Sequence, residues 1–95
     1  MTRILLYTTP FCGFCLAAKR LLTKKGLDFE EIDVSFDDAL RAEMTARAGG
    51  AQTVPQIFVQ DRHLGGYVEL EVLARTGELE AWLARETPDA EPAKP

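Results

Sequence analysis

Residues 8–15 read Thr-Thr-Pro-Phe-Cys-Gly-Phe-Cys and place Cys12 and Cys15 at a C-x-x-C spacing. The apolar run at 4–7 predicts a buried strand before this stretch, and residues 16–22 predict a helix after it. Free N–H groups and the helix macrodipole at a helix start favour a thiolate over a thiol. Cys15 lies on the same helix face as Cys12, one turn deeper. We therefore predict that Cys12 attacks a disulfide and that Cys15 resolves the product.

The composition fits one small domain. The chain has 95 residues, of which 46% are hydrophobic, and this is enough for one modest core. The net charge of -4 argues against a nucleic-acid partner, because a phosphate-binding surface needs a clustered basic excess. We expect a domain over residues 1–86 and a flexible, proline-rich tail over residues 87–95.

The absence of long apolar runs points away from a membrane. No run reaches the roughly 18 residues of a membrane span, and the N-terminus lacks the pattern of a signal peptide. We therefore expect a cytoplasmic protein, and in a reducing compartment a lone C-x-x-C is more often redox-active or metal-binding than structural. Zinc is disfavoured because it takes four ligands, and His63, the only histidine, is expected on the surface of a hairpin.

The hydrophobic pattern predicts the element order β-α-β-α-β-β-α-α. Strands are expected at 3–8, 29–34 and 56–60, with a fourth at 63–64 after a turn at 61–62. Helices are expected at 13–25, from a capping-box pattern at 35–38 to the glycines at 49–50, after 65–66, and at 78–85. The first two strands should be parallel because a helix joins them, and the hairpin should lie antiparallel to the first strand.

The same hydrophobic pattern predicts where the large apolar side chains lie. We expect the core or its margin to hold Phe29, Phe36, Met44, Phe58 and Trp82. Phe11 and Phe14 flank the cysteines, where each either forms an apolar lip around a substrate or packs beneath the helix. Tyr7 is expected to line the underside of the site.

Three motifs together resemble the glutaredoxin family. Tyr7-Thr8 precedes the segment at 10–15, which is followed by Thr-Val-Pro-Gln-Ile-Phe at 53–58 and by glycines at 65–66. Their order and spacing are those of a bacterial dithiol glutaredoxin, and the likeness extends to about residue 86. The resemblance implies the thioredoxin fold, an α/β architecture in which helices flank a four-stranded mixed sheet. It also implies glutathione as the electron donor.

The resemblance further implies where glutathione binds. The residue before Pro55, Val54, would present its backbone to the cysteinyl part in the manner of an added strand. Pro55 would be cis and lie against the C-x-x-C. The helix start at 65–69 would hold the γ-glutamyl end, with N–H groups for its carboxylate and Glu69 for its ammonium group. The glutathione-binding residues expected in this way are Thr9, Phe14, Gln52, Thr53, Val54, Pro55, Gly66, Tyr67, Val68 and Glu69.

The chain departs from the family pattern at several positions. Many dithiol members have lysine where this chain has Thr9, so thiolate stabilisation and capture of the glycyl carboxylate would fall to the helix N-terminus, with Gln52 or Lys19. Val-Glu at 68–69 stands where Ser or Asp followed by Asp is usual. Gly-Phe at 13–14 stands where Pro-Tyr is common, and Cys-Gly-Phe followed by Ser marks the monothiol branch, which is associated with a 2Fe-2S cluster held between two protomers.

Two functions follow from this resemblance. The first is a monomeric, glutathione-dependent thiol–disulfide oxidoreductase that acts on protein disulfides and glutathionylated proteins through Cys12 and Cys15. The alternative is a homodimeric carrier of a 2Fe-2S cluster, with Cys12 and glutathione as ligands. The chain lacks the insertion before the motif and the Trp-Pro dipeptide that the monothiol branch would show. The dithiol enzyme is therefore the favoured interpretation.

Overall fold

The computed structural model describes residues 4–84. Its elements are β1 (Ile4–Thr8), α1 (Gly13–Lys24), β2 (Glu30–Asp33), α2 (Asp38–Arg47), β3 (Gln56–Val59), β4 (Arg62–Gly65), α3 (Tyr67–Thr76) and α4 (Glu78–Ala84). The predicted element order is confirmed. The domain boundary expected at residue 86 and the tail expected at 87–95 lie outside the described residues.

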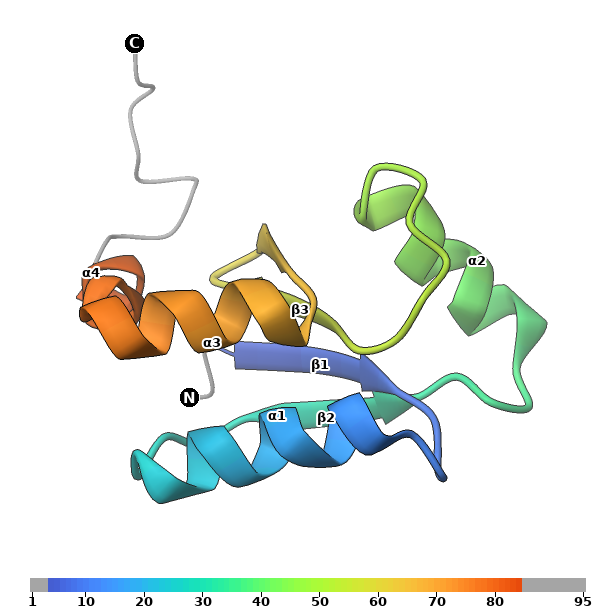
Figure 1. Cartoon of the computed structure of the whole chain (residues 1–95). Coiled ribbons are helices and arrows are strands. Elements are labelled where there is room, and N and C mark those ends of the chain that lie inside the picture. The colour runs from blue at the N-terminus through green and yellow to red at the C-terminus, as the bar shows by residue number, and fades with distance from the viewer. Residues whose placement is uncertain (1–3, 85–95) are drawn as a thin grey trace, which may run out of the picture.

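The four strands form one mixed sheet in the order β2-β1-β3-β4 (Figure 1). β1 pairs in parallel with β2, and β3 pairs antiparallel with both β1 and β4. The predicted pairing is therefore confirmed, with β1 in the interior of the sheet. The C-x-x-C stretch at 8–15 leaves this interior strand, which fixes its starting point by hydrogen bonds on both sides.

Two clusters of buried side chains lie on opposite faces of the sheet. Alternate residues of a strand point to opposite faces, so Ile4 and Leu6 pack on one face while Tyr7 packs on the other. The first cluster joins the sheet to α1, α3 and α4, and the second joins it to α2. The sheet is thus a central layer covered by helices on both faces (Figure 1).

The start of α2 differs from its prediction. Asp37, not Ser35, is the N-cap, and its carboxylate accepts a hydrogen bond from the N–H of Leu40 at 3.0 Å. Ser35 instead donates its backbone N–H and its hydroxyl to the carboxylate of Asp33. Phe36, expected in the core, is 95% exposed, because this connection turns outward between β2 and α2.

The hairpin turn is also displaced by one residue. Gln60 and Asp61 form the loop between β3 and β4, with φ of 53° and 68°, whereas the sequence predicts a turn at 61–62. Two consecutive positive φ angles match the twist of the adjoining strands.

Among the described residues, no helix combines the length and apolar character that crossing a membrane requires.

Candidate active site

Cys12 is the N-cap of α1. Its sulfur accepts a hydrogen bond from the backbone N–H of Cys15, with 3.1 Å between nitrogen and sulfur. The sulfur also lies 3.8 Å from the carbonyl oxygen of Val54. The side chain is half-buried, so an incoming disulfide has access to it. A thiolate at this position receives the N–H groups and the positive end of the helix dipole.

Cys15 has a different environment. It is 1% exposed and packs within the first turns of α1. Burial raises the pKa of its thiol to about 12, and the hydrogen bond to Cys12 adds to this shift. A backbone hydrogen bond from Thr9 and the charge of Lys19 act in the opposite direction on this pKa. Cys15 is therefore less accessible than Cys12, and its burial disfavours the thiolate.

A groove of about 350 Å³ lies beside Cys12. Its walls are Phe14, Thr53, Val54, Pro55, Gly66, Tyr67, Val68 and Glu69. The structure thus brings together eight of the ten residues expected to bind glutathione, and these come from the start of α1, the segment before β3 and the start of α3. The Val54–Pro55 peptide bond is cis, as the resemblance implies.

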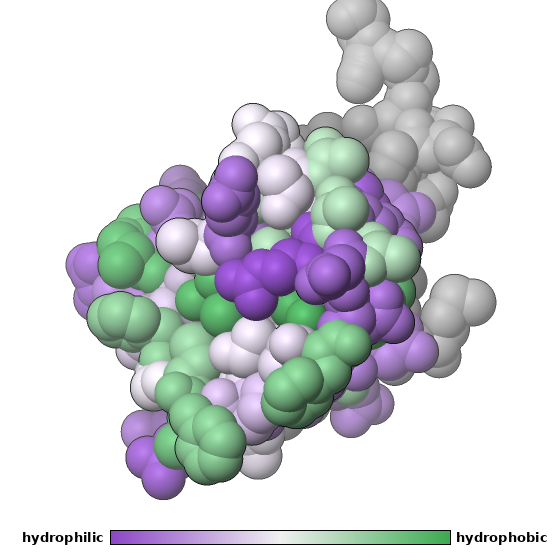
Figure 2. All heavy atoms as spheres, turned by 90° about the vertical axis from the view of Figure 1, so that its right-hand side faces the viewer, coloured by the Kyte–Doolittle hydropathy of each residue, from purple (hydrophilic) through white to green (hydrophobic). Residues whose placement is uncertain are grey.

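The aromatic residues beside the cysteines face outward. Phe14 is 62% exposed and stacks on Tyr67 with 6.0 Å between ring centroids. Phe11, at a φ of 60°, is fully exposed. Neither ring packs beneath the helix, so both belong to the surface around the site. Figure 2, which views the end of the molecule on the right of Figure 1, shows hydrophobic patches on either side of a polar band.

Glu69 closes one end of the groove. Its carboxylate oxygen Oε1 accepts a hydrogen bond from the N–H of Gly66 at 2.9 Å, which caps the start of α3. The neighbouring Gly65 has a φ of 127°, and a Cβ there would lie 3.0 Å from Cγ and Oε1 of Glu69. Both the backbone conformation and the closeness of the Glu69 side chain favour glycine at this position.

Comparison with known proteins identifies the family. The glutaredoxin family model matches residues 4–64, which is more than half of the chain. The chain belongs to the glutaredoxin family. Glutaredoxin from Pseudomonas aeruginosa is 45% identical over 84 residues, covering 88% of this chain and 99% of that protein. Glutaredoxin 3 of Escherichia coli is 40% identical over 83 residues, covering 87% of this chain and 99% of that protein.

Solved structures agree with this assignment. Glutaredoxin from Brucella melitensis is 44% identical with a TM-score of 0.75, covering 87% of this chain and 89% of that one. The buckwheat glutaredoxin–glutathione complex is 26% identical with a TM-score of 0.77, covering 85% of this chain and 76% of that one. This glutaredoxin therefore has the thioredoxin fold, and its family is one of thiol–disulfide oxidoreductases.

Two residues expected to bind glutathione lie outside the groove of this glutaredoxin. Thr9 lines a second hollow of about 300 Å³ together with Cys12, Cys15 and Lys19. The backbone carbonyl of Gln52 accepts a hydrogen bond from Nη2 of Arg41 at 3.1 Å, and Gln52 lines a hollow along α2. Tyr7, expected beneath the site, is buried on the α2 side of the sheet.

Gln56 holds the segment before β3 that lines the groove, and the sequence pattern predicted no role for it. It is 4% exposed, and its Nε2 donates to the carbonyl oxygen of Thr53 at 2.9 Å. Its Oε1 lies 2.6 Å from Nε2 of His63. His63 is exposed on β4, as predicted, and this contact anchors the amide. A buried glutamine in an apolar strand is the sequence signal for such a role.

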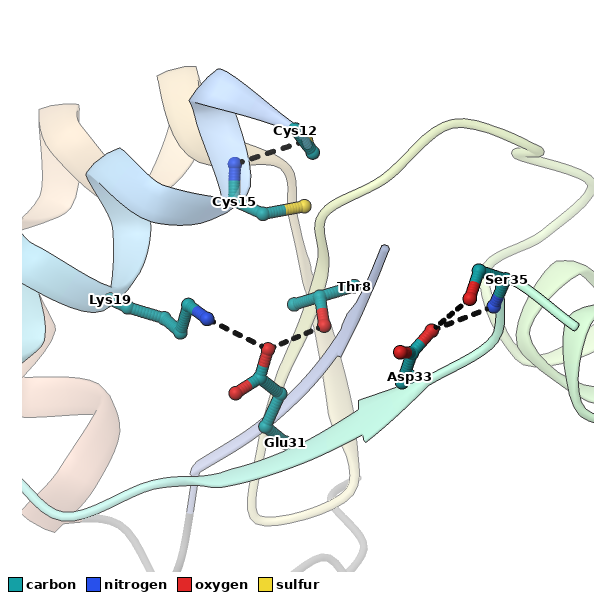
Figure 3. A network of polar contacts seen from close by, with 7 residues as sticks. All are labelled: Thr8, Cys12, Cys15, Lys19, Glu31, Asp33 and Ser35. Atoms are coloured by element: carbon teal, nitrogen blue, oxygen red, sulfur yellow. Dashed lines mark hydrogen bonds and ion pairs between the residues drawn. The ribbon is translucent and has the colours of Figure 1, made fainter. Parts of the chain in front are cut away.

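A polar network lies under the cysteines (Figure 3). Glu31 Oε2 accepts hydrogen bonds from the hydroxyl of Thr8 at 2.7 Å and from Nζ of Lys19 at 2.9 Å. Both interactions lower the pKa of Glu31, and the bond from Thr8 is the larger cause.

Within residues 4–84, no group of three or more His, Cys, Asp or Glu side chains is placed to hold a metal ion.

Proposed function

We propose that this glutaredoxin is a glutathione-dependent oxidoreductase that reduces protein disulfides and glutathione mixed disulfides. The observation that carries the proposal is the placement of a half-buried Cys12 beside a groove, with Cys15 buried one turn deeper. The buckwheat relative, solved as a glutathione complex, supports glutathione as the ligand. We further propose that the enzyme works as a monomer in the reducing cytoplasm, where glutathione keeps thiols reduced.

The first route uses Cys12 alone. Its thiolate attacks the glutathione sulfur of a mixed disulfide, the substrate sulfur leaves as a thiolate and takes a proton from water, and glutathione remains bonded to Cys12. A second glutathione thiolate then attacks the bound glutathione sulfur. This step releases oxidised glutathione and restores the Cys12 thiolate.

The second route uses both cysteines. Cys12 attacks a protein disulfide and forms a mixed disulfide with one of its sulfurs. Cys15 then attacks Cys12, which releases the reduced protein and leaves a Cys12–Cys15 bridge. Glutathione reduces this bridge in two further exchanges.

The groove provides sites for the cysteinyl and γ-glutamyl parts of glutathione. The backbone of Val54 would pair with the cysteinyl part, and the N–H groups at the start of α3 would bind the γ-glutamyl carboxylate. Glu69, which caps that helix, would contact the ammonium group. Phe14 and Tyr67 would cover the bound peptide, with Thr53, Pro55, Gly66 and Val68 lining the walls. Thr9 and Gln52 remain predicted contacts for the glycyl end.

Two serine variants test these roles. We expect Cys12→Ser to abolish reduction of both a glutathionylated peptide and a protein disulfide, measured with glutathione and coupled glutathione reductase. Cys15→Ser should retain the first activity and lose most of the second, because only the second needs a resolving thiol. Equal loss of both activities in the two variants would contradict the one-cysteine route.

The same preparation tests the alternative raised by Gly-Phe at 13–14. The wild-type protein, purified without oxygen and with glutathione present, should be colourless, monomeric and active. A brown dimer that becomes active only after cluster loss would instead favour a 2Fe-2S carrier with Cys12 as ligand.

A further inference from the structure

Cys15 must ionise to resolve the mixed disulfide, but its buried position disfavours ionisation. The sulfur must attack as a thiolate, yet the residue is 1% exposed, and burial disfavours the charged form. The backbone hydrogen bond from Thr9 offsets part of this cost, and a positive charge near the sulfur would lower it further.

Lys19 is placed to do so. It follows Cys15 by four residues on α1, and residues at that spacing lie on one face of a helix. Cys15 and Lys19 line the same hollow, together with Cys12. The side chain of Lys19 is 33% exposed, so its charge is only partly screened by water.

The lysine is also held in place. Its ammonium nitrogen lies 2.9 Å from Oε2 of Glu31, and the same oxygen accepts the hydroxyl of Thr8 at 2.7 Å (Figure 3). Thr8 is 1% exposed and ends β1, so the sheet interior fixes the carboxylate. Glu31 therefore restrains a long, flexible side chain beneath the cysteines, although its own charge offsets part of that of Lys19.

We propose that Lys19, held by Glu31 and Thr8, stabilises negative charge on Cys15 while Cys15 resolves the mixed disulfide at Cys12. The inference rests on the two-cysteine route proposed above. Cys15 loses its proton to water, and its sulfur forms a bond to the sulfur of Cys12. The bond between Cys12 and the substrate sulfur breaks, and the departing thiolate takes a proton from water. Lys19 takes part in neither proton transfer, and it acts as a positioning charge without contacting the substrate.

A single-turnover experiment separates the two steps. Reduced protein is mixed with a disulfide-bonded model peptide, quenched with acid at intervals and analysed by mass spectrometry for mixed disulfide and internal bridge. We expect Lys19→Gln to slow conversion of mixed disulfide to bridge by about 3- to 10-fold, the effect of one partly screened charge. Formation of the mixed disulfide should change less than twofold, and Lys19→Arg should restore the second step.

Two controls make the result specific. Lys24→Gln removes the same charge from an exposed position later on α1 and should change neither rate. A Cys15→Ser background tests the other role considered for Lys19, which is to stabilise the Cys12 thiolate or bind the glycyl carboxylate. If Lys19 acts on Cys15 instead, Lys19→Gln should change reduction of a glutathionylated peptide less than twofold in this background. Slowing of both single-turnover steps by Lys19→Gln, or slowing in the Cys15→Ser background, would overturn the proposal and place Lys19 on glutathione or substrate. Absence of any mixed disulfide at Cys12 in the Cys15→Ser variant would instead refute the proposed function.

Discussion

Gly65 shows how one missing side chain determines the position of a functional group. Glu69 Oε1 lies only 3.0 Å from where a Cβ of residue 65 would be, and it accepts a hydrogen bond from the N–H of Gly66 in this position. A glycine at this position therefore does more than permit a positive φ. It keeps the carboxylate at the end of the groove where the ammonium group of glutathione is proposed to bind.

Gly65→Ala should weaken glutathione binding. The new methyl group displaces the Glu69 carboxylate, and we expect the KM for glutathione to rise about 10- to 150-fold, since loss of a charge-assisted hydrogen bond costs ~1.5–3 kcal/mol. Gly77→Ala is the matched control, because Gly77 also has a positive φ of 87° but a Cβ there would meet nothing within 4 Å. Both variants should lose thermal stability, and an equal rise in KM in both would contradict this role of Gly65.

At the scale of an element, β3 connects the groove to the far end of the molecule through two buried glutamines. Gln56 begins the strand and donates to the carbonyl of Thr53 at 2.9 Å. Gln60 follows its end and donates to the carbonyl of Leu83 at 2.8 Å. The two side chains have similar burial and make the same kind of bond, but only Gln56 supports residues of the groove.

This pair provides a test that separates stability from binding. Gln56→Met and Gln60→Met should each lower the free energy of unfolding by about 0.5–1.5 kcal/mol, because each removes a part-buried side-chain hydrogen bond to a backbone carbonyl. Only Gln56→Met should raise the KM for glutathione, with a smaller change in kcat, because Thr53 and Val54 lose their support. Urea unfolding measures the free energy change in both variants, and steady-state kinetics measure the KM for glutathione. An unchanged KM in Gln56→Met would contradict the proposal that Gln56 positions Thr53 and Val54.

At the scale of the whole molecule, acid stability depends on Glu31. Its pKa is lowered from the ordinary value of 4.5, so it contributes stability above that pH and loses the contribution as the pH falls through the folded value. Glu31→Gln should therefore melt at a lower temperature than the wild type near pH 7, and the difference should shrink toward about pH 3. Glu30→Gln, an equal charge change on the exposed part of β2, controls for net charge. A difference in melting temperature between Glu31→Gln and the wild type that stays constant with pH would contradict this role of the Glu31 carboxylate.

Much of the whole fold could be predicted from the sequence because its elements follow local rules. The apolar run at 4–7 and the alternation at 29–34 predict two strands, and the intervening helix makes them parallel. The position of the turn could not be predicted, because Gln60 and Asp61 adopt positive φ without glycine. Phe36 was misplaced because an apolar residue in a connection has no periodic pattern to assign its direction.

The candidate site was predictable to a different degree. The C-x-x-C at a helix start follows from local pattern, whereas the groove residues at 53–55 and 66–69 followed from the family resemblance. The network of Thr8, Lys19 and Glu31 could not be predicted from either source. Its members lie on β1, α1 and β2, and only the parallel crossover brings their side chains together.

The place of β2 in the sheet has a further consequence for behaviour at high concentration. Within residues 4–84, β2 pairs only with β1, so its other side presents unpaired backbone groups to which a strand of another molecule could add. Glu30, Glu31 and Asp33 occupy three of its four positions. Two copies that approach β2 to β2 would bring these carboxylates together, and their repulsion would oppose pairing at this edge of the sheet.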